Sequence, residues 1–467
     1  MNVAAPLRSA RQLGFWMCVA LVVGNIIGSG IFMMPASLAP YGMNATWAWL
    51  VTGAGAVVLA LVFAGLSRAF PEAGGPYAYT RLAFGELPAF VVIWTYWISL
   101  WVGNAAIATG GVSYLSKLFP WIADVHGASA LVTVGFVILL TGVNVIGARS
   151  AGRLQVVTTA LKIIPLLAIM GLGLWLAATG NPQMHNAHLT ATPFRVDAMT
   201  AAATLILFTL CGLESASVAA DKVKDPERTI PRATIIGTVV CAIVYIVACT
   251  TVMALIPGAT LAQSNAPFAD AAAIFWGSAV AKWLAAFAAI SALGALNGWI
   301  LLCGELPFQL AKDGLFPRAF AKESARRTPT FSLCVSSAIV CVLVLMNYGK
   351  SMVRVFNFLV VLSTSATLVM YFVCALAALK LVRNGRVATG RWTKWLAAAA
   401  VVGAAFALWA IIGAGITTDP KACGNALLCW APWRSNYLYL GAVLLALALP
   451  VYYAMRWRRM APAANGS

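Results

Sequence analysis

Residues Gly24–Phe32, with the sequence GNIIGSGIF, interrupt an otherwise apolar stretch that begins near Leu13. Glycine costs roughly 1 kcal/mol relative to alanine in a helix, so three glycines beside an asparagine predict a weak point in a membrane-spanning segment. Hydrocarbon offers no hydrogen-bond partners for the backbone groups that an unwound turn exposes. We therefore expect the break to line a cavity; the alternative is that its small residues serve close helix packing.

The composition indicates a membrane protein. Hydrophobic residues make up 62% of the 467 residues, charged residues 9%, and the mean hydropathy is +0.88. Globular domains carry about 25% charged residues. Apolar runs of the roughly 20 residues needed to cross a bilayer recur along the chain. They begin near Leu13, Trp47, Leu87, Ala130, Leu154, Met199, Thr234, Ala279, Phe331, Val353, Trp395 and Asn436. The predicted fold class is an all-α membrane protein with about 12 transmembrane helices.

The distribution of basic residues predicts the orientation. With twelve spans, 23 of the 31 Lys and Arg residues fall on the side of both termini and 6 on the other side, and Lys162 and Lys282 lie within spans. By the positive-inside rule, both termini are expected to be cytoplasmic. The net charge of +18 is thus explained by topology, and no nucleic-acid partner is expected.

A second polar interruption, Thr209–Ser217 (TLCGLESAS), lies five spans after the first. A repeat of five spans inserts its second copy inverted, and interruptions at matching positions point to the binding site of an inverted-repeat transporter. The predicted organisation is a cytoplasmic tail at 1–12, a transport core at 13–380 with repeats at about 13–178 and 198–380, two further helices at 393–457, and a cytoplasmic tail at 458–467.

Several motifs carry a family resemblance. They are GNIIGSGIF followed by Met34-Pro35-Ala36, GGPYAY at 74–79, TLCGLESASVAA at 209–220, PERTIP at 226–231 and KDGLFP at 312–317. With them the chain resembles the amino acid–polyamine–organocation (APC) superfamily, and within it the bacterial basic amino acid and polyamine antiporters that include arginine/agmatine exchangers. The resemblance runs from about Gly14 to Arg383 and more weakly to the end.

The resemblance implies a LeuT-like fold of two inverted five-helix repeats, with helices 1 and 6 broken. It also implies a bacterial inner (plasma) membrane location, small-molecule amino acid or amine substrates, and contact with membrane lipid. The two further helices often lie at a dimer interface in this superfamily, so a homodimer is one expected assembly.

The first break is suited to bind a carboxylate. Backbone N–H groups of Gly28, Ser29 and Gly30 lie before a half-helix, whose N-terminus favours anions. The resemblance assigns the substrate carboxylate to this turn and the ammonium to carbonyls near Thr209 to Gly212.

The resemblance also implies a set of substrate-binding and gating residues. Trp299 matches a tryptophan that stacks on the substrate cation, a contact of about 2 kcal/mol when desolvated. Phe208 replaces a second clamping tryptophan, and Ser99 and Leu100 also depart from the pattern. The implied substrate-binding residues are Asn25, Ile26, Gly28, Ser29, Gly30, Ser99, Leu100, Asn104, Ile107, Phe208, Cys211, Trp299 and Ser363, and the gating residues are Tyr77, Tyr96 and Tyr371. From the residues alone, Asn25 and Asn104 also suit interhelical hydrogen bonds.

Two ionisable residues lie deep in the predicted spans, and such residues are usually functional. Burial disfavours the charged form of either group, so Glu214 and Lys162 are candidates for proton coupling. The resemblance gives Glu214 a pH-sensing role. Lys162 matches the lysine of sodium-independent APC transporters, whose ammonium replaces a sodium ion bridging to the first span. The alternatives are a structural carboxylate at Glu214 and a Lys162 side chain that snorkels to the interface.

The sequence holds no catalytic His/Asp/Ser set and no metal-ligand spacing, so we expect no enzymatic activity, no cofactor and no metal. Two transport hypotheses remain. Motif similarity favours exchange of an arginine-like amino acid for an agmatine-like amine. Phe208 and Lys162 favour sodium-independent, proton-coupled or exchange transport of a broader amino acid set. In the last external loop, Cys423 and Cys429 are suited to form a disulfide in an oxidising periplasm, and the sequence leaves that open.

Overall fold

The computed structural model describes residues 14–71, 75–146, 148–182, 192–218, 223–324, 328–347, 349–387, 390–416 and 437–460. Cys423 and Cys429 lie outside this range. The helices before residue 220 are α1 (Phe15–Ile26), α2 (Gly30–Leu38), η1 (Ala39–Tyr41), α3 (Met43–Ala69), α4 (Gly75–Phe84), α5 (Glu86–Leu115), α6 (Trp121–Asp124), α7 (Ala128–Ile146), α8 (Ala148–Ala178), α10 (Val196–Thr209) and α11 (Ser215–Val218). Those that follow are α12 (Pro226–Leu255), α13 (Gly258–Leu261), α14 (Pro267–Lys312), η4 (Arg318–Ala321), α15 (Thr330–Leu345), α16 (Met352–Arg383), α17 (Arg391–Gly413), α19 (Tyr437–Ala446) and α20 (Ala448–Met460).

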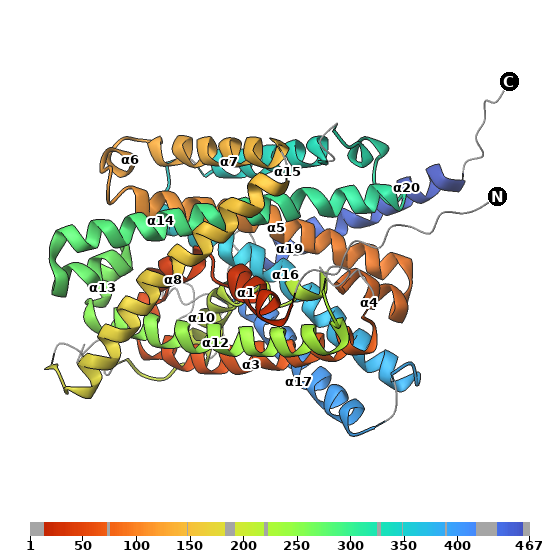
Figure 1. Cartoon of the computed structure of the whole chain (residues 1–467), viewed down its shortest axis with the longest axis horizontal. Helices are drawn as coiled ribbons and strands as arrows, with labels where there is room; N and C mark the ends of the chain where they lie inside the picture. The colour runs from red at the N-terminus through yellow and green to blue at the C-terminus, as the bar shows by residue number, and fades with distance from the viewer. Residues whose placement is uncertain are drawn as a thin grey trace.

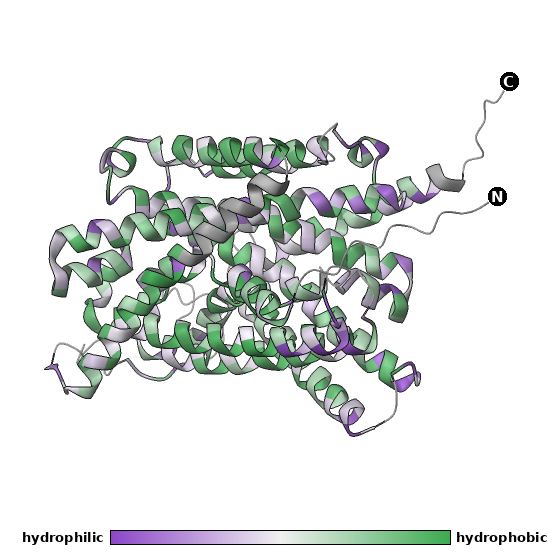
Figure 2. Ribbon diagram, viewed as in Figure 1, coloured by the Kyte–Doolittle hydropathy of each residue, from purple (hydrophilic) through white to green (hydrophobic). Residues whose placement is uncertain are grey.

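The prediction of a helical, multi-pass membrane protein is confirmed. Among the described residues, 9 helices are long and apolar enough to span a membrane, or up to 10 if the bent pair α1 and α2 forms one span. The shorter apolar helices α10, of 14 residues, and α15, of 16 residues, occupy the positions expected for the sixth and ninth spans. Apolar residues dominate most of these helices, as Figure 2 shows.

The helices form a bundle with α5 near its centre (Figure 1). α5 packs against both α14 and α16, and of the candidate spans it has the largest buried share. α3 and α12 pack together on one side of the bundle, and α7 packs against α15 on another. α1 lies against α12, so the first break is enclosed by other helices.

Two helices are broken where the sequence predicts. α1 ends at Ile26 and α2 begins at Gly30, with a bend of 41° between the two. The second break separates α10 from α11, and within it Gly212 has φ +105, a conformation that side chains with a Cβ rarely adopt. These breaks bring four helix ends into the middle of the bundle.

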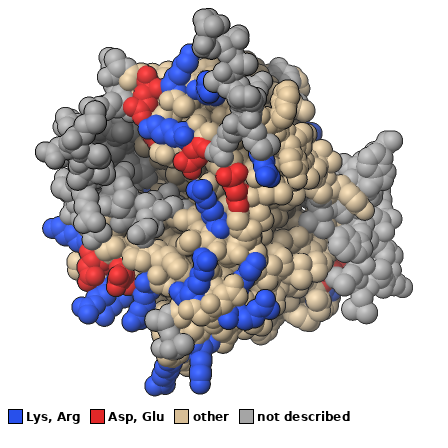
Figure 3. All heavy atoms as spheres, turned by 90° about the vertical axis from the view of Figure 1, so that its right-hand side faces the viewer, with Lys and Arg blue, Asp and Glu red and all other residues tan. Residues whose placement is uncertain are grey.

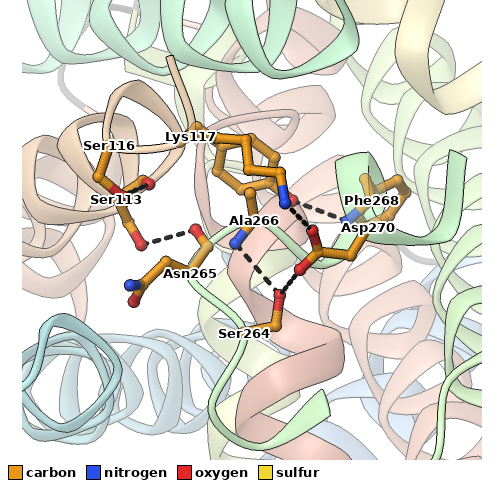
Figure 4. Close-up of polar contacts among 9 residues, drawn as sticks. Ser113, Ser116, Lys117, Ser264, Asn265, Ala266, Phe268 and Asp270 are labelled. Carbon is orange, nitrogen blue, oxygen red and sulfur yellow. Dashed lines mark hydrogen bonds and ion pairs between the residues drawn. The ribbon is translucent and has the colours of Figure 1, made fainter. Parts of the chain in front are cut away.

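At one end of the bundle, the connection between α13 and α14 is fastened to α5 (Figure 4). The Tyr114 hydroxyl donates to the Phe32 carbonyl of α2 at 2.8 Å and accepts from the Phe268 N–H at 3.0 Å. Lys117 pairs with Asp270 at 2.5 Å. Further bonds run from Ser264 to Asp270 and from Ser113 to the Asn265 carbonyl. Through Tyr114, this connection is linked to the half-helix that follows the first break.

Small residues allow α14 and α15 to approach closely, as is common in membranes. The hydroxyl of Ser332 donates to the Gly304 carbonyl at 2.5 Å, and a Cβ on Gly304 would lie 2.5 Å from Leu333 Cδ2 and 3.2 Å from its Cα. Leu333 is fully buried.

Gly304→Ala should therefore lower the thermal unfolding midpoint in detergent, because overpacking a core costs typically 1–3 kcal/mol. Gly135→Ala in α7 is the matched control, since no atom lies within 4 Å of its new Cβ. The control should be neutral or stabilising. Equal midpoints for both variants would contradict close packing at Gly304.

Candidate substrate site

The first break is stabilised by side chains from neighbouring helices. The Gly28 N–H donates to Ile26 O at 2.9 Å instead of continuing the helix, so the Gly24 carbonyl loses its regular partner. The Lys162 ammonium, from α8, donates to Gly24 O and to Ile27 O, the latter at 2.7 Å. The Tyr245 hydroxyl, from α12, donates to Ile26 O at 2.8 Å.

Lys162 is only 1% exposed, and its ammonium bonds to α1. The snorkelling alternative is therefore wrong. Lys162 therefore links α8 to the first break, and its role in place of a bridging cation stays a prediction.

A cavity of about 50 Å³ lies between the two breaks. A volume of this size holds a few water molecules, so a substrate would need the lining to move apart. Twelve of the thirteen predicted substrate-binding residues line it, together with Tyr96, Gly103, Thr209, Glu214 and Thr367. Their contact with substrate stays a prediction. Sequence reasoning missed Gly103 and Thr367 as lining residues, although each lies within one helical turn of a predicted one, Asn104 or Ser363.

Ser29 is the predicted residue that does not line the cavity. It is 1% exposed, and its hydroxyl has no hydrogen-bond partner among the described residues. It packs beside α5, where a Cβ added to Gly110 would lie 3.2 Å from the Ser29 hydroxyl oxygen. The turn therefore presents Gly28 and Gly30 to the cavity and the serine to α5.

Helix ends of opposite polarity meet at this cavity. α2 begins at Gly30 and α10 ends at Thr209, and both residues are part of the lining. A helix N-terminus carries a partial positive charge and a C-terminus a partial negative one. The cavity wall thus carries a partial positive charge at the α2 end and a partial negative charge at the α10 end.

Glycines bring the two breaks into contact. A Cβ on Gly212 would lie 3.3 Å from the Asn25 carbonyl carbon and 3.3 Å from the Trp299 ring. A Cβ on Gly30 would lie 3.1 Å from the Phe208 ring. Larger residues at either glycine would separate the breaks or displace the aromatic rings that line the cavity.

Glu214 connects the second break to two other helices. Its carboxylate accepts hydrogen bonds from Tyr96 of α5 at 2.8 Å and from Tyr371 of α16 at 2.7 Å. The side chain is 1% exposed and contributes to the cavity wall. Both tyrosines were predicted as gates; Tyr96 lines the cavity and Tyr371 does not.

Tyr77, the third predicted gate, lies on α4 outside the cavity lining. The Arg81 guanidinium lies over its ring at 5.9 Å. The structure therefore does not bring Tyr77 together with the other site residues.

Asn104 is the clearest polar feature of the cavity wall. Its side chain is 1% exposed, and neither amide atom has a hydrogen-bond partner among the described residues. The neighbouring hydroxyls are already engaged, with Ser363 donating to Ser99 O at 2.8 Å and Ser99 to Tyr96 O at 2.7 Å. A buried amide without a partner costs about 1–3 kcal/mol, which a bound ligand would recover.

Comparison with known proteins identifies the family of this chain. The family model for amino acid permease matches residues 13–444. This chain belongs to the amino acid permease family of the APC superfamily. It is 34% identical over 376 residues to the cadaverine/lysine antiporter of Escherichia coli (strain K12), covering 78% of this chain and 83% of that protein. It is 30% identical over 413 residues to the putrescine transporter PotE of the same organism, covering 87% and 92%. Family members of this kind are transporters, and this permease is not an enzyme.

In this permease, Asn104→Leu should weaken ligand binding without weakening the fold, because the amide has no partner in the protein. We expect about a tenfold or larger rise in Kd, the loss of a hydrogen bond to a charged ligand. Calorimetric titration with lysine and arginine measures the affinity, and the thermal midpoint without ligand measures the fold.

The matched control is Asn144→Leu. Asn144 is also buried but donates to Leu140 O and to Asn297 O and Oδ1. This variant should lower the thermal midpoint. An Asn104 variant that binds ligand normally but unfolds earlier would identify Asn104 as structural.

Proposed function

We propose that this permease exchanges a cationic amino acid for its decarboxylated amine by alternating access, and that the pair is arginine-like and agmatine-like. The observation that carries the proposal is the charge of the cavity. Among the described residues, its lining holds one carboxylate, Glu214, and no Lys, Arg or His. The cadaverine/lysine antiporter named above supports exchange of an amino acid for an amine.

The cavity wall matches the parts of such substrates. The α2 N-terminus is suited to the carboxylate, which the amine lacks, and the α10 C-terminus is suited to an ammonium. Trp299 offers an aromatic face to the side-chain cation. Because amino acid and amine share the cationic groups, one cavity accepts both in turn.

A second candidate is sodium-independent, proton-coupled or exchange transport of a broader amino acid set. Two observations favour it. Phe208 lines the cavity, and a tryptophan there would bind a cation more strongly. Lys162 bonds to carbonyls of the first break, where the resemblance implies that an ammonium replaces a bridging cation. Under this second candidate function, neutral amino acids would also be substrates.

We also propose the arrangement of the chain in the membrane. Residues 13–380 would form the two inverted repeats of a LeuT-like core, and α17, α19 and α20 would be the additional helices, available for a homodimer. Figure 3 shows Lys and Arg side chains gathered on one end of the bundle. Near the end of α16, Lys380 lies over the Phe84 ring at 4.8 Å, and Arg386 donates to Leu82 O. By the positive-inside rule, the basic end of the bundle would be cytoplasmic.

Exchange is tested with purified protein in proteoliposomes. Vesicles preloaded with agmatine, cadaverine, putrescine or buffer alone are given radiolabelled arginine or lysine without sodium. The proposal expects uptake that depends on an internal amine. Strong competition by neutral amino acids would support the second candidate, and uptake into empty vesicles at the same rate would exclude exchange.

Trp299→Ala should weaken arginine binding by about 1–2 kcal/mol, the loss of a cation–π contact. Phe208→Trp should strengthen it, because the larger indole is the better partner for a guanidinium. Calorimetric titration measures both. Loss of arginine binding in the Phe208 variant, with neutral amino acids still bound, would favour the broader transporter.

Two substitutions test whether Glu214 or Lys162 is the group that couples transport to protons. If Glu214 titrates during transport, Glu214→Gln should imitate its protonated form and flatten exchange between about pH 5 and 8. If Lys162 titrates, Lys162→Gln should flatten the profile while Glu214→Gln keeps it. Tyr245→Phe removes another hydrogen bond to the first break without removing a charge, and it controls for loss of structure there. Wild-type profiles in both charge variants would exclude coupling through either residue.

A further inference from the structure

An apolar groove runs along the outer surface of α3 and α17, away from the central cavity. Val58 and Leu61 of α3 line one side, and Trp395, Ala398 and Val402 of α17 line the other. α3 and α17 are both candidate membrane spans and pack together (Figure 1). Trp395 is 62% exposed. The groove therefore lies open on the outer surface of the chain.

One end of the groove is basic. Arg391 is part of the lining, and it is the first residue of α17. Arg68, in the last turn of α3, lies with its guanidinium 5.1 Å from the centre of the Trp392 ring. Among the described residues, the lining includes no acidic side chain. An anion at this end would thus meet two guanidinium groups from two helices.

The start of α17 adds a second argument for an anion. The helix begins Arg391-Trp392-Thr393-Lys394, with no acidic residue in its first turn and no side-chain cap at Gly390. A helix N-terminus attracts anions and repels cations, so two cations in the first turn are unfavourable in isolation. A bound phosphate would neutralise both the helix end and the arginines.

Trp392 supplies a further unsatisfied group. Its indole N–H is buried and has no acceptor among the residues that the structure describes. A phosphate or glycerol oxygen at the basic end would provide an acceptor with a small shift of the ring. Tryptophan also favours the level of the lipid headgroups.

We propose that the α3–α17 groove binds an anionic phospholipid. Its phosphate would lie between Arg68 and Arg391 at the α17 N-terminus, and one acyl chain would lie along the groove past Trp395. The apolar length of the groove favours a phospholipid over free phosphate, and its charge favours an anionic over a zwitterionic headgroup.

The test uses the full-length protein in detergent with added phosphatidylglycerol or phosphatidylcholine. Native mass spectrometry counts the lipids retained, and thermal unfolding reports their effect on stability. We expect selective retention of phosphatidylglycerol and a higher midpoint with it. Arg68→Gln/Arg391→Gln should weaken that binding about thirtyfold, since each of the two basic residues near the lipid surface contributes about 1 kcal/mol.

Arg318→Gln/Lys322→Gln is the matched control. It removes two exposed positive charges from the predicted cytoplasmic side, where Arg68 and Arg391 are also predicted to lie. The control variant should retain as much phosphatidylglycerol as the wild type. The charge-conserving variant Arg68→Lys/Arg391→Lys should retain most of the phosphatidylglycerol that the wild type binds. Equal retention of both lipids by the wild type, or unchanged retention by the double glutamine variant, would overturn the proposal. Stabilisation by inorganic phosphate alone would identify a simple anion site. Loss of a dimer in the double variant, with no lipid retained by the wild type, would identify a subunit interface.

Discussion

The contact between the Lys162 ammonium and the first break is the one on which the candidate substrate site depends. A charge inside a bilayer is costly, and so are carbonyl groups without partners. Here each compensates the other, because the ammonium donates to Gly24 O and Ile27 O, which the unwound turn has released from helical bonding. Without such a donor, the continuous helix would be the more stable form. With it, α2 can begin at Gly30 and present its N-terminus to the cavity.

Much of this arrangement could be predicted from the sequence, because glycines and a buried carboxylate are conspicuous in apolar helices. They located both breaks, and family motifs located twelve of the residues that line the cavity. The position of Ser29 could not be predicted, since helical periodicity does not define side-chain directions in an unwound turn. The lack of any partner for Asn104 also depends on neighbours from other helices. For the same reason, Tyr77 and Tyr371 could not be separated from Tyr96 by sequence alone.

Glu214 and Lys162 have complementary places in the structure. Lys162 satisfies acceptors of the first break from outside the cavity, whereas Glu214 lines the cavity beside the second break. The Glu214 carboxylate holds Tyr96 and Tyr371, and so joins α5, α16 and the second break through one side chain. A cation or proton that changes the charge at Glu214 acts on three parts of the bundle at once. A change at Lys162 acts first on the backbone of α1.

These contacts also define where the first span can bend. α1 is held at its end by Lys162 and Tyr245, which bond to carbonyls up to Ile27. α2 is held separately, with Tyr114 bonded to Phe32 O in the network that includes the α13–α14 connection. The only residues between the two helices are Ile27, Gly28 and Ser29. We therefore expect any relative motion of the two halves to be concentrated in this turn, next to the cavity wall. A ligand that bonds to the turn from the cavity would stabilise one angle between α1 and α2 over others, which is the differential interaction that any ligand-driven conformational change requires.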